Sequence, residues 1–275
     1  MSQNDWEIIR GVRKDMSDYV LHCTKPRWDG NTGTVVSAYE VLKEILICGY
    51  LKPSFALSQY GIPTVRGSKP AVCFTEQPLQ FFITLTEAAL TTIRYTKFGI
   101  VMRKDDLFDY GGRPVIYSAD SELPDIPDAM KFRWVGYDPR KLWTQTNPID
   151  WTHEREWRVK ADAEMNSKAM MGPHGEGMVP LLIPTTRPTI PTAPNNKSNR
   201  RFIVIVDTQA RLQELREWVD ELIPNLRARG PAYWRQYAES LQEEWSILSL
   251  EFVSKVLFVT KGGWGRLEDI YRARP

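Results

Sequence analysis

The stretch Trp151-Thr-His-Glu-Arg-Glu-Trp-Arg158 is the last of a series of short strand-like segments, and this series decides the fold class. The earlier segments, all rich in β-branched or aromatic residues, are Phe98–Met102, Pro114–Tyr117 and Lys131–Tyr137. Their short connections favour an antiparallel sheet over repeated βαβ units, which need a helix of about a dozen residues in each connection. The sequence therefore predicts an α+β fold with an antiparallel sheet and flanking helices.

Upstream of this series, a strand and a capped helix are expected. Tyr19–Cys23 is typical of a short buried strand, and the segment Lys25–Gly33 after it is rich in turn residues. Ser37 with Glu40 three positions later fits a capping box, and Gly49 is a natural C-terminal cap. We expect a helix between these two caps.

A second strand and helix follow a predicted loop. Lys52–Pro70 is polar and contains Gly and Pro, which indicates a loop, and Ala71–Phe74 is a short apolar strand. Thr75 is then expected to cap a helix that runs as far as Leu90. The local order is strand, turn, helix.

The last third of the chain is expected to complete the same core. Gly172–Arg200 is dominated by Pro, Thr, Asn and Gly, which predicts an exposed loop, and Phe202–Val206 is a buried strand. Thr208–Leu222 and Tyr233–Glu244 have helical patterns, and Val256–Val259 is a final strand. We predict one domain over 1–275, with 172–200 as a Pro-rich loop and 201–275 as the strand and helix completion of the core.

Composition excludes several classes of protein. The chain has 275 residues and a formal net charge of +2, too close to neutral for a dedicated duplex-DNA binder. Its three cysteines are an odd number and lack metal-ligand spacing, so neither a disulfide framework nor a metal site is indicated. The N-terminus lacks an apolar signal core, and no stretch approaches the ~18 apolar residues of a spanning helix. A cytoplasmic protein without a membrane or metal partner is expected.

The stretch Trp151–Arg158 also carries the most enzyme-like group of side chains. Alternation along one continuous strand would put Thr152, Glu154, Glu156 and Arg158 on the same face. Neighbouring carboxylates raise one pKa unless a cation compensates, and Arg158 is placed to do so. An exposed edge strand also carries alternating Glu and Arg for solubility, and this alternative stays open.

Two further groups of residues have candidate roles. His22, at the end of an apolar strand, precedes Cys23 and Thr24 and presents an imidazole and a hydroxyl at a sheet edge. A lone His is more often structural, and Cys23 is most simply a small buried hydrophobe. Arg66 lies in a loop before the second strand and could hold a phosphate, although a loop arginine is usually solvated. Neither a Rossmann GxGxxG nor a P-loop motif is present.

In their order, these motifs resemble the ADP-ribosyltransferase fold, in particular the DarT-like toxin and phage-defence proteins. The resemblance rests on Leu21-His-Cys-Thr24, on Arg66 ahead of Ala71-Val-Cys-Phe-Thr-Glu-Gln-Pro-Leu79, and on the Glu-x-Glu pair. A second resemblance, to AbiGi-like abortive-infection proteins, runs through Phe98-Gly-Ile, Arg113-Pro-Val-Ile-Tyr117 and His153-Glu-Arg-Glu-Trp-Arg158. Together they imply a split antiparallel β-sheet core with flanking helices.

The resemblance also implies roles for particular residues, with NAD as co-substrate. The implied NAD-binding residues are His22, Cys23, Thr24, Arg66, Phe74 and Thr75. Glu156 would be catalytic, because a carboxylate near the ribose stabilises the oxocarbenium-like transition state left by departing nicotinamide. Glu154 would orient the acceptor. Phe74-Thr75 stands where many relatives have Tyr or Ser, so the resemblance does not specify the exact nicotinamide contacts.

The expected function is that of an NAD-dependent ADP-ribosyltransferase, a bacterial toxin or anti-phage effector. Its acceptor would be single-stranded nucleic acid or a protein, and an antitoxin or regulatory protein would be a further partner. Two alternatives are a non-catalytic abortive-infection or antitoxin-like partner, and an RNA-binding module that stacks bases on Trp and Arg.

Overall fold

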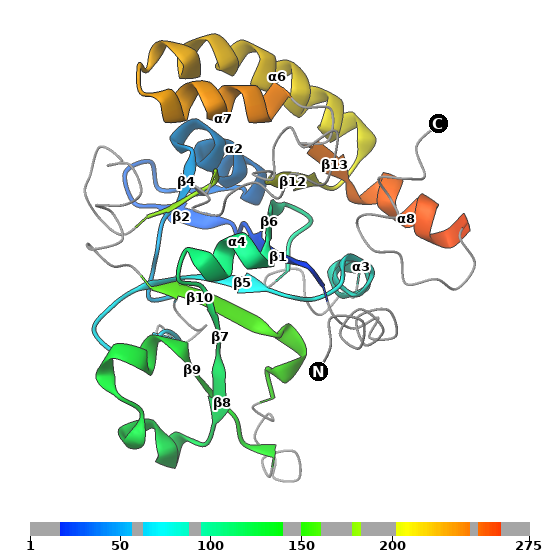
Figure 1. Ribbon diagram of the computed structural model, residues 1–275. Helices are drawn as coiled ribbons and strands as arrows, with labels where there is room; N and C mark the ends of the chain where they lie inside the picture. Colours follow the sequence, from blue (N-terminus) through cyan, green and yellow to red (C-terminus); the bar gives the residue numbers. More distant parts are fainter. Residues whose placement is uncertain are drawn as a thin grey trace, which may run out of the picture. The chain divides into compact units, whose positions relative to one another are not determined.

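The computed structural model describes residues 17–56, 63–87, 95–139, 150–160, 178–182, 202–242 and 247–259 (Figure 1). The chain divides into two compact units, each assembled from separated segments. The first consists of Met1–Gly49, Gln77–Arg103 and Arg201–Pro275, and the second of Tyr50–Glu76 and Lys104–Arg200. The single domain expected over 1–275 stays a prediction.

Four strands of the main sheet belong to the first unit, in the order β13-β12-β6-β1. Strand β1 (Tyr19–Cys23) pairs antiparallel with β6 (Gly99–Arg103), and β6 pairs antiparallel with β12 (Ile203–Val206). Strand β12 pairs in parallel with β13 (Ile247–Ser249). All four residues of β12 are buried, as expected of a strand covered on both faces. The strands predicted near residues 19, 98 and 202 are confirmed.

Helices of the first unit pack on this sheet and on each other. Helix α3 (Leu79–Glu87) contacts α8 (Leu250–Val259), and both contribute to one apolar core with β1, β6, β12 and β13. Helix α6 (Gln209–Ala228) lies beside α7 (Ala232–Gln242), close to α2 (Ala38–Cys48) (Figure 1). The α7 tyrosines Tyr233 and Tyr237 donate to the carbonyls of Gly49 and Leu46, which ties α7 to the end of α2.

The caps predicted for α2 are confirmed in the structure. The Ser37 side chain accepts from the backbone N–H of Glu40 at 3.2 Å. Gly49 has φ 73°, in the left-handed region that favours glycine, and its N–H reaches the carbonyl of Ile45 at 2.8 Å. A Cβ at Gly49 would also lie 2.9 Å from the Trp234 ring, so this position excludes larger residues on two grounds.

The second unit contains three strands in the order β5-β10-β7. Strand β10 (Glu156–Lys160) pairs antiparallel with β5 (Ala71–Thr75) and with β7 (Arg113–Pro114). Two small sheets accompany them, formed by β8 (Ile116–Ser118) with β9 (Trp134–Gly136), and by β4 (Tyr50–Leu51) with β11 (Val179–Pro180). Its helices are α4 (Lys104–Asp109) and the short 3₁₀ helices η1 (Asp120–Asp125), η2 (Asp128–Arg133) and η4 (Thr152–Glu154).

Three predicted segments have a different structure. The turn-rich Lys25–Gly33 contains β2 (Arg27–Asp29), which forms a hairpin with β3 (Thr34–Val36). Thr75 is the last residue of β5 and caps no helix, since α3 begins at Leu79. The strand predicted at Val256–Val259 is the end of helix α8, because its apolar residues continue a helical pattern that begins at Leu250.

The predicted Pro-rich loop lies mostly outside the described residues. Its described part, 178–182, includes β11, and Val179, Leu181 and Leu182 are at most 5% exposed. An exposed loop is therefore wrong for this short piece, which packs its apolar side chains inward.

The α+β prediction is confirmed at the level of fold class. Helices accompany strands that pair mostly antiparallel, with β12–β13 and β8–β9 as parallel exceptions. None of the helices in the described ranges combines the length and the apolar character that a membrane crossing requires.

Candidate functional site

The chain turns sharply just before β10, which corrects the predicted face of Glu154. Asp150 accepts from the backbone N–H of Thr152 at 2.9 Å and from its hydroxyl, and these hydrogen bonds lower the pKa of Asp150. The 3₁₀ helix η4 follows, and Arg155 has a left-handed backbone with φ 47°. Alternation therefore begins only at Glu156. Glu156 and Arg158 share a face as predicted, whereas Glu154 lies on the preceding turn.

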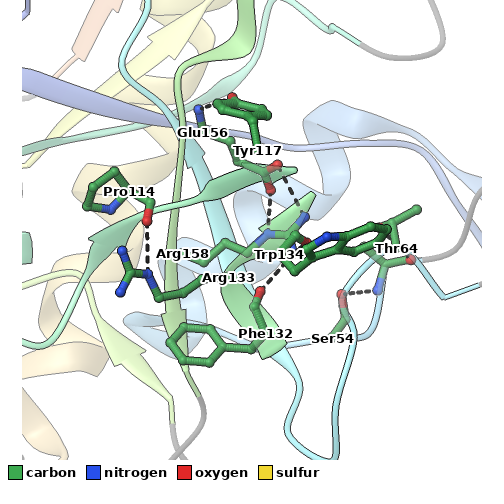
Figure 2. A network of polar contacts seen from close by, with 10 residues as sticks. Ser54, Thr64, Pro114, Tyr117, Phe132, Arg133, Trp134, Glu156 and Arg158 are labelled. Atoms are coloured by element: carbon green, nitrogen blue, oxygen red, sulfur yellow. Dashed lines mark hydrogen bonds and ion pairs between the residues drawn. The ribbon is translucent and has the colours of Figure 1, made fainter. Parts of the chain in front are cut away.

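Glu156 and Arg158 form a buried ion pair at the start of β10 (Figure 2). Arg158 donates from Nε to Glu156 Oε1 at 2.8 Å and from Nη2 to Oε2 at 3.2 Å. The side chains are 3% and 10% exposed. Burial acts to lower the pKa of Arg158, but the Glu156 carboxylate and Cys73 oppose it, and the net shift is upward. The predicted compensation of a Glu156 charge by Arg158 is thus present as a two-point contact.

The same arginine is also anchored to the backbone, which fixes the pair in space. Arg158 Nη1 donates to the carbonyls of Phe132 at 2.7 Å and Trp134 at 3.1 Å. A carboxylate has about four acceptor positions, and Arg158 occupies two of those of Glu156. Glu156 therefore has a fixed orientation and keeps acceptor capacity for a hydroxyl group.

The backbone of Glu156 is held from the segment that runs from β7 into β8. Its N–H donates to the Tyr117 hydroxyl at 3.1 Å, and its carbonyl accepts from the N–H of Val115 at 3.0 Å. Burial raises the pKa of Tyr117 to about 12, so the phenol is neutral at physiological pH. Opposite Glu156, Thr75 donates its hydroxyl to the carbonyl of Glu154. Thr75 thereby joins β5 to the turn that carries Glu154.

Phe74 and Thr75 point to opposite faces of the β5–β10 pair. Thr75 is in register with Glu156, and Phe74 with Trp157. Because neighbouring residues in a strand alternate, Thr75 shares the face of Glu156, whereas Phe74 shares that of Trp157. Both side chains are buried, with 7% and 2% exposure. Of the two, Thr75 is the one on the same face as the proposed catalytic carboxylate.

Sequence reasoning gave no role to a second buried carboxylate, Glu76. This residue is 6% exposed and accepts from Lys104 Nζ at 2.9 Å, Arg155 Nη2 at 3.2 Å and Trp157 Nε1 at 2.8 Å. Its signal in the sequence was an acidic residue directly after an apolar strand. The contacts hold Arg155, and hence the turn before β10, against the end of β5.

Arg66 and the Glu156–Arg158 pair both contact Trp134. Its guanidinium is 5.7 Å from the centre of the Trp134 ring, and the carbonyl of the same Trp134 accepts from Arg158. The Nε of Arg66 is buried and has no hydrogen-bond partner within the described part of the chain. A buried guanidinium nitrogen without an acceptor suits an anionic ligand such as a diphosphate.

The remaining candidates, His22, Cys23 and Thr24, belong to the first unit. His22 and Cys23 are half-buried on β1, in register with Ile100 and Gly99, and Cys23 packs against the apolar core. Thr24 is 1% exposed and donates its hydroxyl to the carbonyl of Ala38 at 2.9 Å. The structure thus brings together Arg66, Thr75, Glu154 and Glu156 in one unit and His22, Cys23 and Thr24 in the other.

Among the described residues, no three His, Cys, Asp or Glu side chains are grouped as a metal site requires. The comparisons with known proteins add no relative: no family model, no curated protein and no solved structure matches this chain.

Proposed function

We propose that this chain is an NAD-dependent ADP-ribosyltransferase whose catalytic carboxylate is Glu156. One observation carries the proposal. The buried Glu156 carboxylate is paired with Arg158, which donates to the carbonyl of Trp134. The ring of the same Trp134 lies under Arg66, whose buried Nε has no acceptor among the described residues. A carboxylate for the ribose and a cation for the diphosphate are the two groups that NAD requires from such a site.

The chemistry follows from the position of positive charge in the transition state. The bond between ribose C1′ and the nicotinamide nitrogen breaks, and its electron pair leaves with nicotinamide. The ribose then carries oxocarbenium character, which a fixed carboxylate stabilises more strongly than it stabilises the ground state. The acceptor forms the new bond to C1′ and loses its proton to a carboxylate. Glu156 supplies the fixed charge because Arg158 and the backbone prevent it from reorienting.

Glu154 is the proposed group for the acceptor. It is half-buried on the turn before β10, and its carbonyl is bound by the Thr75 hydroxyl. A side chain on a turn beside a strand end reaches an incoming molecule more readily than one in the sheet. The resemblance further assigns NAD contacts to His22, Cys23, Thr24, Phe74 and Thr75, and toxin or anti-phage activity to the whole chain. A cytoplasmic location is expected from its composition. These assignments are part of the proposal.

Transfer of label from NAD tests the proposal. The purified protein is incubated with NAD labelled in the adenylate half, and with single-stranded DNA, RNA or cell lysate. We expect label on one of these acceptors, and at least a hundredfold loss for Glu156→Gln. Glu44→Gln is a matched control, because Glu44 pairs with Arg27 on the exposed surface. Wild-type protein that neither transfers label nor consumes NAD would refute the proposal.

A non-catalytic partner protein is the second candidate, and the same ion pair favours it. Glu156 is only 8% exposed and is bound at both oxygens by Arg158, an arrangement that also occurs in purely structural pairs. NAD binding separates the two functions. A thermal shift with NAD that is lost in Arg66→Gln supports the enzyme, whereas no shift together with co-purification of a second protein supports the partner.

A further inference from the structure

Arg113 is stacked on an exposed aromatic ring. Its guanidinium carbon lies 3.9 Å from the centre of the Phe108 ring, and Nη1 donates to the carbonyls of Phe108 and Gly112, each at 2.7 Å. Phe108, on α4, is still 45% exposed. The hydrogen bonds use one nitrogen of Arg113 and hold the guanidinium over the ring.

Arg133 is a second cation in the same neighbourhood. Its Nε donates to the carbonyl of Pro114, the residue after Arg113, at 2.9 Å. Figure 2 shows its guanidinium beside Pro114 and turned away from the Arg158 pair. Burial lowers the pKa of Arg133, and the nearby positive charge of Arg113 lowers it further.

Unlike four other described arginines, these two have no carboxylate partner among the described residues. Arg27, Arg155, Arg158 and Arg211 each form an ion pair with a glutamate. Neither Arg113 nor Arg133 forms one anywhere in the described ranges; both are fixed by carbonyl oxygens alone. Carbonyls orient a guanidinium without neutralising it, so two positive charges stay available for an anion.

We propose that Arg113, Arg133 and Phe108 form a binding site for single-stranded nucleic acid. The arginines bind successive phosphates, and the Phe108 ring stacks on a base. Single strands fit better than duplex, because a base must leave its own stack to reach an aromatic side chain. The net charge of +2 also provides little of the wide positive surface that duplex requires.

The position of the site relates it to the proposed activity. Arg113 is on β7 and is in register with Arg158 of β10, two residues from Glu156. A nucleic-acid strand bound at β7 would lie along the edge of the sheet, next to β10, which carries the proposed catalytic carboxylate. The role of this nucleic acid as the acceptor rests on the proposed function, whereas binding of the nucleic acid does not.

Fluorescence anisotropy with labelled oligonucleotides in the absence of NAD tests the site. We expect wild-type protein to bind single-stranded DNA or RNA of about 20 nucleotides more tightly than the matching duplex. In the Arg113→Gln/Arg133→Gln variant, the affinity should fall at least tenfold at moderate salt. The slope of log Kobs against log salt should become shallower by about 1.4, from two lost phosphate contacts at about 0.7 each. Phe108→Ala should weaken binding roughly tenfold with the slope unchanged.

Arg27→Gln, which removes an exposed arginine already paired with a glutamate, is the control and should bind like wild type. Circular dichroism and the single variants Arg113→Gln and Arg133→Gln exclude a folding defect.

Unchanged affinity and slope in the double variant would overturn the site, as would absence of oligonucleotide binding or equal binding of duplex. If the double variant loses the NAD thermal shift but still binds the oligonucleotide, the arginines bind the diphosphate of NAD instead. If the wild-type protein binds the oligonucleotide but shows no NAD chemistry, the result supports this site and contradicts only the proposed function.

Discussion

Separate removal of Glu156 or Arg158 should destabilise the protein far more than removal of both. Glu156→Gln leaves Arg158, 3% exposed, charged and without its carboxylate partner, while two carbonyls still accept from it. Arg158→Met leaves the Glu156 carboxylate, 10% exposed, without its cation. Each single change breaks a buried pair and should lower the free energy of unfolding by about 3–5 kcal/mol. The double variant removes both charges and leaves two carbonyls without a donor, for a loss of about 1–3 kcal/mol.

Urea denaturation at pH 7, followed by tryptophan fluorescence, measures the coupling between the two residues. The single losses add to roughly 6–10 kcal/mol, so the expected coupling is at least about 3 kcal/mol. Additive losses, with a coupling below about 0.5 kcal/mol, would refute the buried pair as described. The double variant also sharpens the enzymatic test. The Glu156→Gln/Arg158→Met variant should be folded and still inactive. Label transfer by this variant would show that Glu156 takes no part in the chemistry.

Three further predictions concern other parts of the fold. Glu76→Gln breaks ion pairs with two cations that are 21% and 32% exposed, so it should lower the free energy of unfolding in urea by about 2 kcal/mol. Asp128→Asn, which breaks an exposed pair, should lower it by under about 1 kcal/mol. Equal effects would contradict a structural role for Glu76. Gly49→Ala should lower Tm more than Gly230→Ala, because both have positive φ but only the first meets a tryptophan ring, and the reverse order would contradict the packing. Tyr117 has a pKa of about 12 in the folded protein and about 10 in the unfolded chain. The raised pKa stabilises the folded protein below pH 10, and this stabilisation is lost as the pH rises towards 12. Tyr117→Phe should make the fall of unfolding free energy over that range shallower, and an unchanged slope would refute the assignment.

The sequence by itself determined the parts of the fold that depend on neighbouring residues. Ser37 and Gly49 define the ends of α2, because a cap needs only a side-chain acceptor or a left-handed residue at the right position. The run of apolar residues at 203–206 predicts a buried strand for the same local reason. The pairing of Glu156 and Arg158 on one face also follows from alternation along a single strand.

Tertiary structure decided which residues meet across the chain. The turn η4 interrupts the strand pattern from Trp151, and the end of β5 holds this turn, with Thr75 bound to the Glu154 carbonyl and Glu76 to Arg155. Glu154 therefore lies off the face of Glu156. The position of Glu76 directly after an apolar strand does not by itself predict its partners, because Trp157 reaches it only when β10 pairs with β5 and Lys104 comes from α4. The position of Arg66 near Trp134 likewise depends on a contact between residues 68 positions apart. Local patterns fix backbone conformation, whereas the partners of a buried charge depend on strand pairing and side-chain packing, which a single sequence does not state.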